Sequence, residues 1–102
     1  MILKVAEVLL DNGDAELIFD ELINREDFDL ILSKFKDING VKVLKKTEDE
    51  TNKACLLSNG VFEFVLAYST DSFLWNYAYA VKRENHGQLK DLCKKLGEFV
   101  SK

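Results

Sequence analysis

Few residues of this chain have the types and spacing that enzyme chemistry requires. A nucleophile and base would have to come from Cys55 or Cys93 with His86, the only histidine, and neither cysteine lies within a catalytic signature. The five glycines are isolated, so they form no phosphate-binding loop, and the two cysteines lack the ligand spacing of a zinc site. The sequence therefore predicts a protein that is not an enzyme and has no catalytic residue, metal site or cofactor, with an active site made of carboxylates alone as the remaining alternative.

Both cysteines lie among apolar neighbours, where a reduced thiol behaves as a small hydrophobic side chain. We expect them to be buried and unpaired, as is typical of a reducing compartment. The first residues have no basic region before an apolar stretch, and no apolar run approaches the ~20 residues that cross a bilayer. These features predict a cytoplasmic protein with no membrane contact.

Carboxylates are the most frequent candidate binding groups, and they are concentrated near the start of the chain. Residues 1–40 contain four basic and ten acidic residues, a net charge of −6, whereas residues 41–102 have a net charge of +2. Such a negative surface repels a phosphate backbone and attracts cationic protein surfaces over roughly 8 Å at physiological salt. The alternative is a solvated surface that keeps the protein soluble.

The charge pattern favours a small protein-binding module of the inhibitor, immunity, antitoxin or adaptor type. Its expected partner is a basic protein, with nucleic-acid enzymes as a subclass because their grooves are basic. Direct contact with nucleic acid is not expected. The residues predicted to bind the partner are Asp20, Glu21, Glu26, Asp27 and Asp29.

The elements that must position these carboxylates are indicated by the spacing of apolar residues. Before Gly40 this spacing is i, i+3, i+4 and i+7, which predicts helices over residues 2–11, 14–23 and 24–38. Asn12-Gly13 and Asn39-Gly40 supply the residue pair that ends a helix in a left-handed conformation. The acidic residues would then lie on the second and third helices.

After Gly40 the period changes to 2, which predicts strands over residues 41–46, 53–58, 61–69 and 73–82. Asn59-Gly60 predicts a type I′ hairpin turn. A further helical stripe covers residues 85–100. We therefore expect a single domain over residues 1–102 of the α+β class, with three N-terminal helices, a four-stranded antiparallel meander and a C-terminal helix packed on the sheet.

Three aromatic residues, Trp75, Tyr77 and Tyr79, alternate along the last predicted strand and share one face of it. We expect this face to lie in the core, beneath the helices. The alternative is an exposed aromatic stripe that binds another protein or forms a homodimer through the sheet.

Residues 2–58 resemble the winged helix-turn-helix pattern of prokaryotic regulators, with Asn12-Gly13 between the first two helices and a hairpin after the third. The resemblance implies that the third helix enters the major groove and that the hairpin contacts the DNA backbone. The recognition segment is acidic, however, so the alternative function is a transcriptional regulator that binds DNA through the Val41–Ser58 hairpin as its wing. The residues implied by this alternative are Lys42, Lys45, Lys46 and Lys53.

Overall fold

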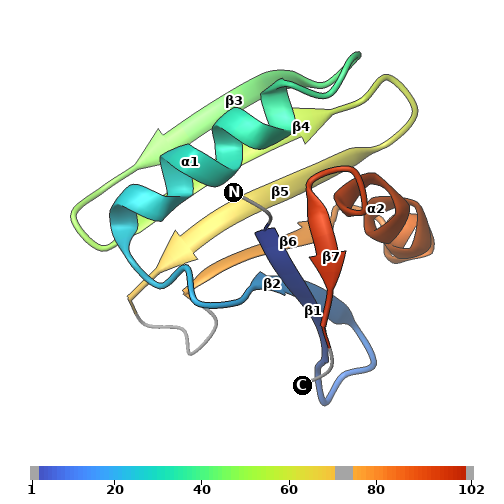
Figure 1. The fold of residues 1–102 in the computed structure, drawn as a ribbon, viewed down its shortest axis with the longest axis horizontal. Coiled ribbons are helices and arrows are strands. Elements are labelled where there is room, and N and C mark those ends of the chain that lie inside the picture. Colours follow the sequence, from blue (N-terminus) through green and yellow to red (C-terminus); the bar gives the residue numbers. More distant parts are fainter. Residues whose placement is uncertain (1–2, 71–74, 101–102) are drawn as a thin grey trace.

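The computed structural model describes residues 3–70 and 75–100, which form a sheet with two helices packed in one hydrophobic core (Figure 1). Neither of these helices is long and apolar enough to cross a membrane. The sheet order in the described part is β3-β4-β5-β6-β2-β1-β7, antiparallel throughout except for the parallel pair β1 and β7. The elements are β1 (Leu3–Leu9), β2 (Ala15–Phe19), α1 (Arg25–Lys36), β3 (Lys42–Glu48), β4 (Asn52–Ser58), β5 (Glu63–Ser69), β6 (Asn76–Ala80), the 3₁₀ turn η1 (Arg83–Asn85), α2 (His86–Cys93) and β7 (Gly97–Phe99).

The predicted helices over residues 2–11 and 14–23 are wrong, because these segments form the antiparallel hairpin of β1 and β2. Short apolar runs fit a period of 2 as well as one of 3.6. On β1, Leu3 and Val5 are buried while Lys4 between them is exposed, which is the alternation of a strand. β1 takes the period of a strand while it pairs with β2 on one side and with β7 on the other.

The Asn-Gly pairs lie in turns between strands as well as after a helix. At Asn12-Gly13 the glycine has a φ of +88°, and the amide of Leu10 donates to the carbonyl of Asp14 at 2.8 Å, so the pair forms the β1–β2 turn. Asn59-Gly60 joins β4 to β5. Only its glycine has positive φ, so the expected type I′ conformation is wrong.

The fold class predicted from the sequence is wrong as a whole. The segment 24–38 contains α1, and the strands expected between residues 41 and 82 overlap β3 to β6, which pair in sequence order. This meander is part of a seven-stranded sheet in the described part of the chain, and only two short helices accompany it there. The winged-helix description fails for the same reason, since β1 and β2 occupy the place of its first two helices.

The C-terminal segment, expected as one helix over residues 85–100, divides into α2 and β7. β7 lies parallel to β1, with Gly97 opposite Leu3. A Cβ atom at Gly97 would lie 1.8 Å from the carbonyl oxygen of Leu3, so the glycine is what allows this close approach. The strand extends the sheet beyond β1 to its second edge.

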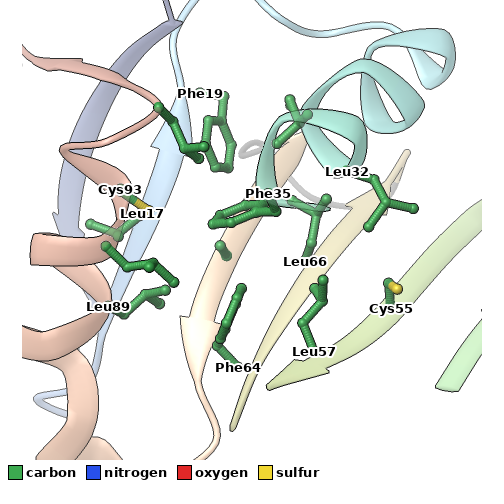
Figure 2. Packing of buried hydrophobic residues seen from close by; sticks show 14 of the residues in the cluster. Leu17, Phe19, Leu32, Phe35, Cys55, Leu57, Phe64, Leu66, Leu89 and Cys93 are labelled. Carbon is green, nitrogen blue, oxygen red and sulfur yellow. The ribbon is translucent and has the colours of Figure 1, made fainter. Parts of the chain in front are cut away.

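The two helices bury the same face of the sheet, and Phe35 of α1 is at the centre of the packing (Figure 2). Its ring centroid lies 5.1 Å from that of Phe64 on β5 and 6.2 Å from that of Phe19 on β2. Leu89 and Cys93 of α2 complete this core. The alternate residues of the strands form the opposite side of the sheet, here called the uncovered face, which includes Ile18, Ala54, Leu56, Val65, Tyr77 and Tyr79.

Candidate functional site

A cavity opens in the sheet where β2 and β6 separate. The two strands pair only at Leu17 with Ala78 and at Ile18 with Tyr77, and the pairing stops before Glu16. The space between the separated ends has a volume of about 610 Å³, within the range of ligand sites, and opens to solvent. It is lined by Leu10, Asp14, Ala15, Glu16, Tyr77, Tyr79, Ala80, Val81, Arg83 and His86.

Two groups that line this cavity have a buried side-chain atom with no hydrogen-bond partner in the described part of the chain. These atoms are Oε2 of Glu16 and Nδ1 of His86. Burial, and to a smaller extent the negative charge of Asp14, raise the pKa of Glu16 above its ordinary value. A buried carboxylate without a donor is costly, and this one therefore needs a structural or functional explanation.

The tyrosines next to Glu16 form an aromatic wall. The rings of Tyr77 and Tyr79 are stacked, with centroids 6.2 Å apart and an interplanar angle of 20°. Burial, followed by the charge of Glu16, raises the pKa of both phenols, so both remain protonated at neutral pH. The wall therefore offers apolar ring faces together with hydroxyl groups that donate hydrogen bonds.

The prediction that the aromatic stripe of β6 lies in the core is wrong for two of its three members. Tyr77 and Tyr79 line the cavity, and Tyr79 is 37% exposed. Trp75 has a φ of +56° just before β6, which breaks the alternation, and its indole packs against the core with its centroid 6.5 Å from the Tyr68 ring. The side chains of β6 that face the helices are instead those of Asn76, Ala78 and Ala80.

The other charged groups of the cavity already have partners. The guanidinium Nε of Arg83 donates to Asp14 at 2.5 Å, which neutralises the second carboxylate that lines the cavity. His86 Nε2 lies 2.6 Å from a carboxylate oxygen of Glu7, which also pairs with Lys90 at 3.4 Å. Both contacts lower the pKa of Glu7, the hydrogen bond to the histidine most strongly. Glu16 thus remains as the cavity's carboxylate without a cation.

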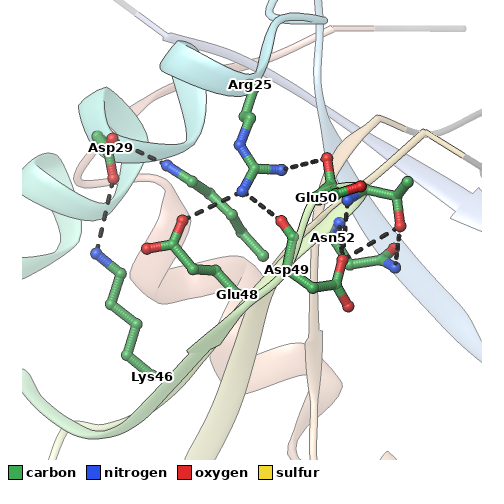
Figure 3. Close-up of polar contacts among 9 residues, drawn as sticks. Arg25, Asp29, Lys46, Glu48, Asp49, Glu50 and Asn52 are labelled. Atoms are coloured by element: carbon green, nitrogen blue, oxygen red, sulfur yellow. Dashed lines mark hydrogen bonds and ion pairs between the residues drawn. The ribbon is translucent and has the colours of Figure 1, made fainter.

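The carboxylates predicted to bind a partner lie elsewhere, on and before α1, and Figure 3 shows one of them, Asp29. Asp29 accepts a hydrogen bond from Lys53 at 3.0 Å and lies 3.9 Å from the ammonium of Lys46. Asp27 accepts from the amide of Asn24 at 3.0 Å, within the capping box that starts the helix. The remaining predicted residues are half-buried at Asp20 and exposed at Glu21 and Glu26.

Two of the four lysines of the predicted wing, Lys46 and Lys53, contact Asp29, while Lys42 and Lys45 are exposed. Lys53 is only 8% exposed and lies 5.4 Å from the centroid of the Phe28 ring, and Lys46 shares Asp29 with it. Lys42 and Lys45 are exposed on β3, the edge strand. Lysines on an edge strand protect it against pairing with other chains.

Arg25 fastens the tip of the β3–β4 hairpin to the start of α1. Its guanidinium pairs with Glu48 at 3.2 Å and donates to the backbone carbonyls of Asp49 and Glu50, at 2.6 and 3.3 Å (Figure 3). The side chain of Asp49 accepts from backbone amides inside the turn, which lowers its pKa. The polar groups of this region are therefore used to join the helix to the sheet.

Neither cysteine is part of the cavity. Cys55 and Cys93 are free and buried. Burial raises the pKa of the Cys55 thiol above its ordinary value, and it raises the pKa of the Cys93 thiol to about 12. Both are therefore protonated and unreactive at neutral pH. Among the described residues, no three His, Cys, Asp or Glu side chains are arranged to hold a metal ion.

Comparison with protein-family models, with curated proteins and with solved structures finds no match to this chain. The chemistry of the cavity is therefore the basis for a functional assignment. An unpaired carboxylate beside two aromatic rings is suited to a cation, because the carboxylate supplies charge and the ring faces attract cations.

Proposed function

We propose that this chain is a non-enzymatic protein-binding module of the cytoplasm that engages a basic protein partner. The observation that carries the proposal is the half-buried Glu16 side chain in the β2–β6 cavity, whose carboxylate pairs with no cation among the described residues and has one oxygen without a hydrogen-bond partner. The buried, unpaired thiols of Cys55 and Cys93 support a reducing compartment. The proposal keeps the basic partner that the acidic sequence predicts, and it moves the proposed binding surface from α1 to the cavity.

The uncovered face around the cavity is a better binding surface than α1. Three of the five carboxylates predicted to bind the partner, at Asp20, Asp27 and Asp29, belong to residues that already interact within the fold. The uncovered face combines aliphatic side chains with the rings of Tyr77 and Tyr79. Aromatic residues beside a desolvated charge are characteristic of the residues that dominate protein interfaces.

The test is affinity capture from the native source with three baits: the full chain, its Glu16→Gln variant and its Glu63→Gln variant. Glu63 is exposed on β5, on the uncovered face but outside the cavity, so it is a matched control for loss of one charge elsewhere on that face. A fourth bait, Glu21→Lys with Glu26→Lys, tests the exposed carboxylates near α1.

We expect the wild-type and Glu63→Gln baits to retain the same basic protein and the Glu16→Gln bait to lose it. The captured protein is then purified and rebound, and its affinity should fall as salt is raised. An acidic partner, or binding that Glu16→Gln leaves unchanged, would refute the proposal. If only the Glu21→Lys, Glu26→Lys bait fails to capture the protein, the binding surface lies around α1 instead.

A further inference from the structure

We propose that the β2–β6 cavity is a subsite for one guanidinium group, an arginine side chain of the partner, with Glu16 as its anchoring carboxylate and the Tyr77 and Tyr79 rings as its stacking surface. This inference rests on the proposed function and deepens it. It identifies a site, a ligand chemistry and the number of charges that the site accepts.

The number of cationic charges that the cavity accepts follows from the ion pair between Arg83 and Asp14. The cavity is lined by two carboxylates, and the chain's own guanidinium neutralises that of Asp14 at 2.5 Å. Arg83 is bound through its Nε, and its side chain is 67% exposed at the rim, so it leaves the interior and Glu16 free. One negative charge therefore remains, which matches a single monovalent cation.

The choice of guanidinium over ammonium follows from the aromatic wall. A guanidinium is planar and weakly hydrated, so it can stack on a tyrosine ring while its N–H groups bond a carboxylate at its edge. An ammonium holds its water more strongly and cannot stack. Because Glu16 is half-buried in the wall of the cavity, a cation beside it must lose part of its water, and this favours the group with the smaller dehydration cost.

An anion is the other charged ligand that the lining could suggest, since Arg83 and His86 both border the cavity. Each already contacts a carboxylate, Asp14 and Glu7 respectively. An anion in the cavity would therefore face Glu16 with no free cation to offset the repulsion. The two ligand classes predict opposite effects of removing Arg83, which makes them separable by experiment.

The experiment uses the full chain, isotope-labelled, and three blocked tripeptides added separately: acetyl-Gly-Arg-Gly-amide, its lysine analogue and its citrulline analogue. Binding is followed by NMR chemical-shift changes. We expect a saturable shift of the Tyr77 and Tyr79 amides with the arginine peptide, a weaker one with lysine and none with citrulline, which has arginine's shape without its charge. Glu16→Gln should weaken arginine binding at least about tenfold, and Glu63→Gln should leave it unchanged.

Arg83→Gln supplies a test with the opposite sign. Removing this guanidinium frees Asp14, so arginine binding should strengthen about two- to fivefold, the range expected for one exposed ion pair. Lys82→Gln is the control, because Lys82 is exposed one position earlier and does not line the cavity. The amide spectrum of each variant shows whether the fold is retained.

Three results would overturn the inference. Binding of inorganic phosphate that is lost in Arg83→Gln would make the cavity an anion site. A lysine peptide that binds as well as the arginine peptide would remove the guanidinium assignment. Absence of arginine binding while a basic protein is still captured would refute the subsite and leave the proposed function standing, whereas arginine binding with no captured protein would support the subsite and refute that function.

Discussion

The carboxylate of Asp29 on α1 has cationic partners within the protein, whereas the carboxylate of Glu16 in the β2–β6 cavity has none among the described residues. Asp29 on α1 contacts two lysines from the sheet, and one of these, Lys53, is itself buried. Glu16 in the cavity is partly buried and has no partner for one of its oxygens among the described residues. The first arrangement stabilises the fold, while the second costs stability unless a ligand is bound.

This difference shows why a count of charges is a poor guide to a binding surface. The region around α1 contributes much of the negative charge of residues 1–40, yet Asp27 caps the helix and Asp29 neutralises lysines. Among the described residues, the carboxylates that line the cavity are those of Asp14 and Glu16, and Arg83 neutralises that of Asp14. A single unneutralised charge in a partly dehydrated site can attract a ligand more strongly than several exposed ones.

The largest expected effect on the free energy of unfolding comes from Asp29→Asn, which removes the ion pairs between α1 and the sheet. The substitution keeps the size of the side chain but removes the charge that faces Lys46 and the buried Lys53. We expect the free energy of unfolding to fall by about 1–3 kcal/mol, because the Lys53 ammonium stays buried without its counter-ion. Urea denaturation measures the change.

Glu26→Gln is the control for this prediction, since it removes one exposed carboxylate from the same helix. Its effect should stay within about 0.5 kcal/mol. If both substitutions have equally small effects, the Asp29 ion pairs do not stabilise the fold, and the contrast between the two regions is lost.

A smaller effect of opposite sign is expected on the cavity side with Glu16→Gln. Folding places the Glu16 carboxylate where its charged form is disfavoured, so the neutral amide should raise the free energy of unfolding by no more than about 1 kcal/mol. The same substitution should abolish arginine binding. Greater stability together with lost binding identifies a residue kept for function, whereas a loss of stability would mean that Glu16 has a structural role.

The parts of the fold that local patterns could predict are those stabilised by neighbours in sequence. The segment that contains α1 has a clear helical stripe, and β3 to β6 pair with strands that precede or follow them directly. β1 and β2 pair with each other across a short turn, and each also pairs with a strand more than fifty residues away, β7 and β6 respectively. Their short apolar runs contain no information about those distant partners, so the helical period was equally compatible with them.

The cavity was hidden from the sequence for a related reason. Its lining comes from the turn after β1, the start of β2, the end of β6 and the turn η1, and Asp14 and Arg83 are 69 positions apart. Glu16 lies within the segment 14–23 that was predicted to be a helix, and that pattern assigns it no binding role. The signal that could have corrected this is Asn12-Gly13, because an Asn-Gly pair between two alternating apolar runs is also a hairpin signal.

The smallest effect, and the one most specific to the cavity, is the pH dependence of the stability difference between wild type and Glu16→Gln. Burial raises the folded-state pKa of Glu16 above its unfolded value, so the wild type is penalised at neutral pH, where its carboxylate is charged in both states. As the pH falls through that raised pKa, the folded protein takes up a proton and the penalty disappears.

The melting temperatures of the two proteins should therefore differ most at neutral pH and converge as the pH is lowered. The other ionisable groups that line the cavity are Asp14, Tyr77, Tyr79, Arg83 and His86, and they are present in both proteins, so their titration cancels in the difference to first order. Thermal unfolding of each variant across this pH range provides the comparison. A difference that stays constant, or that widens in acid, would mean that the Glu16 carboxylate is not destabilised by its site and that the cavity has no unneutralised charge to offer a cation.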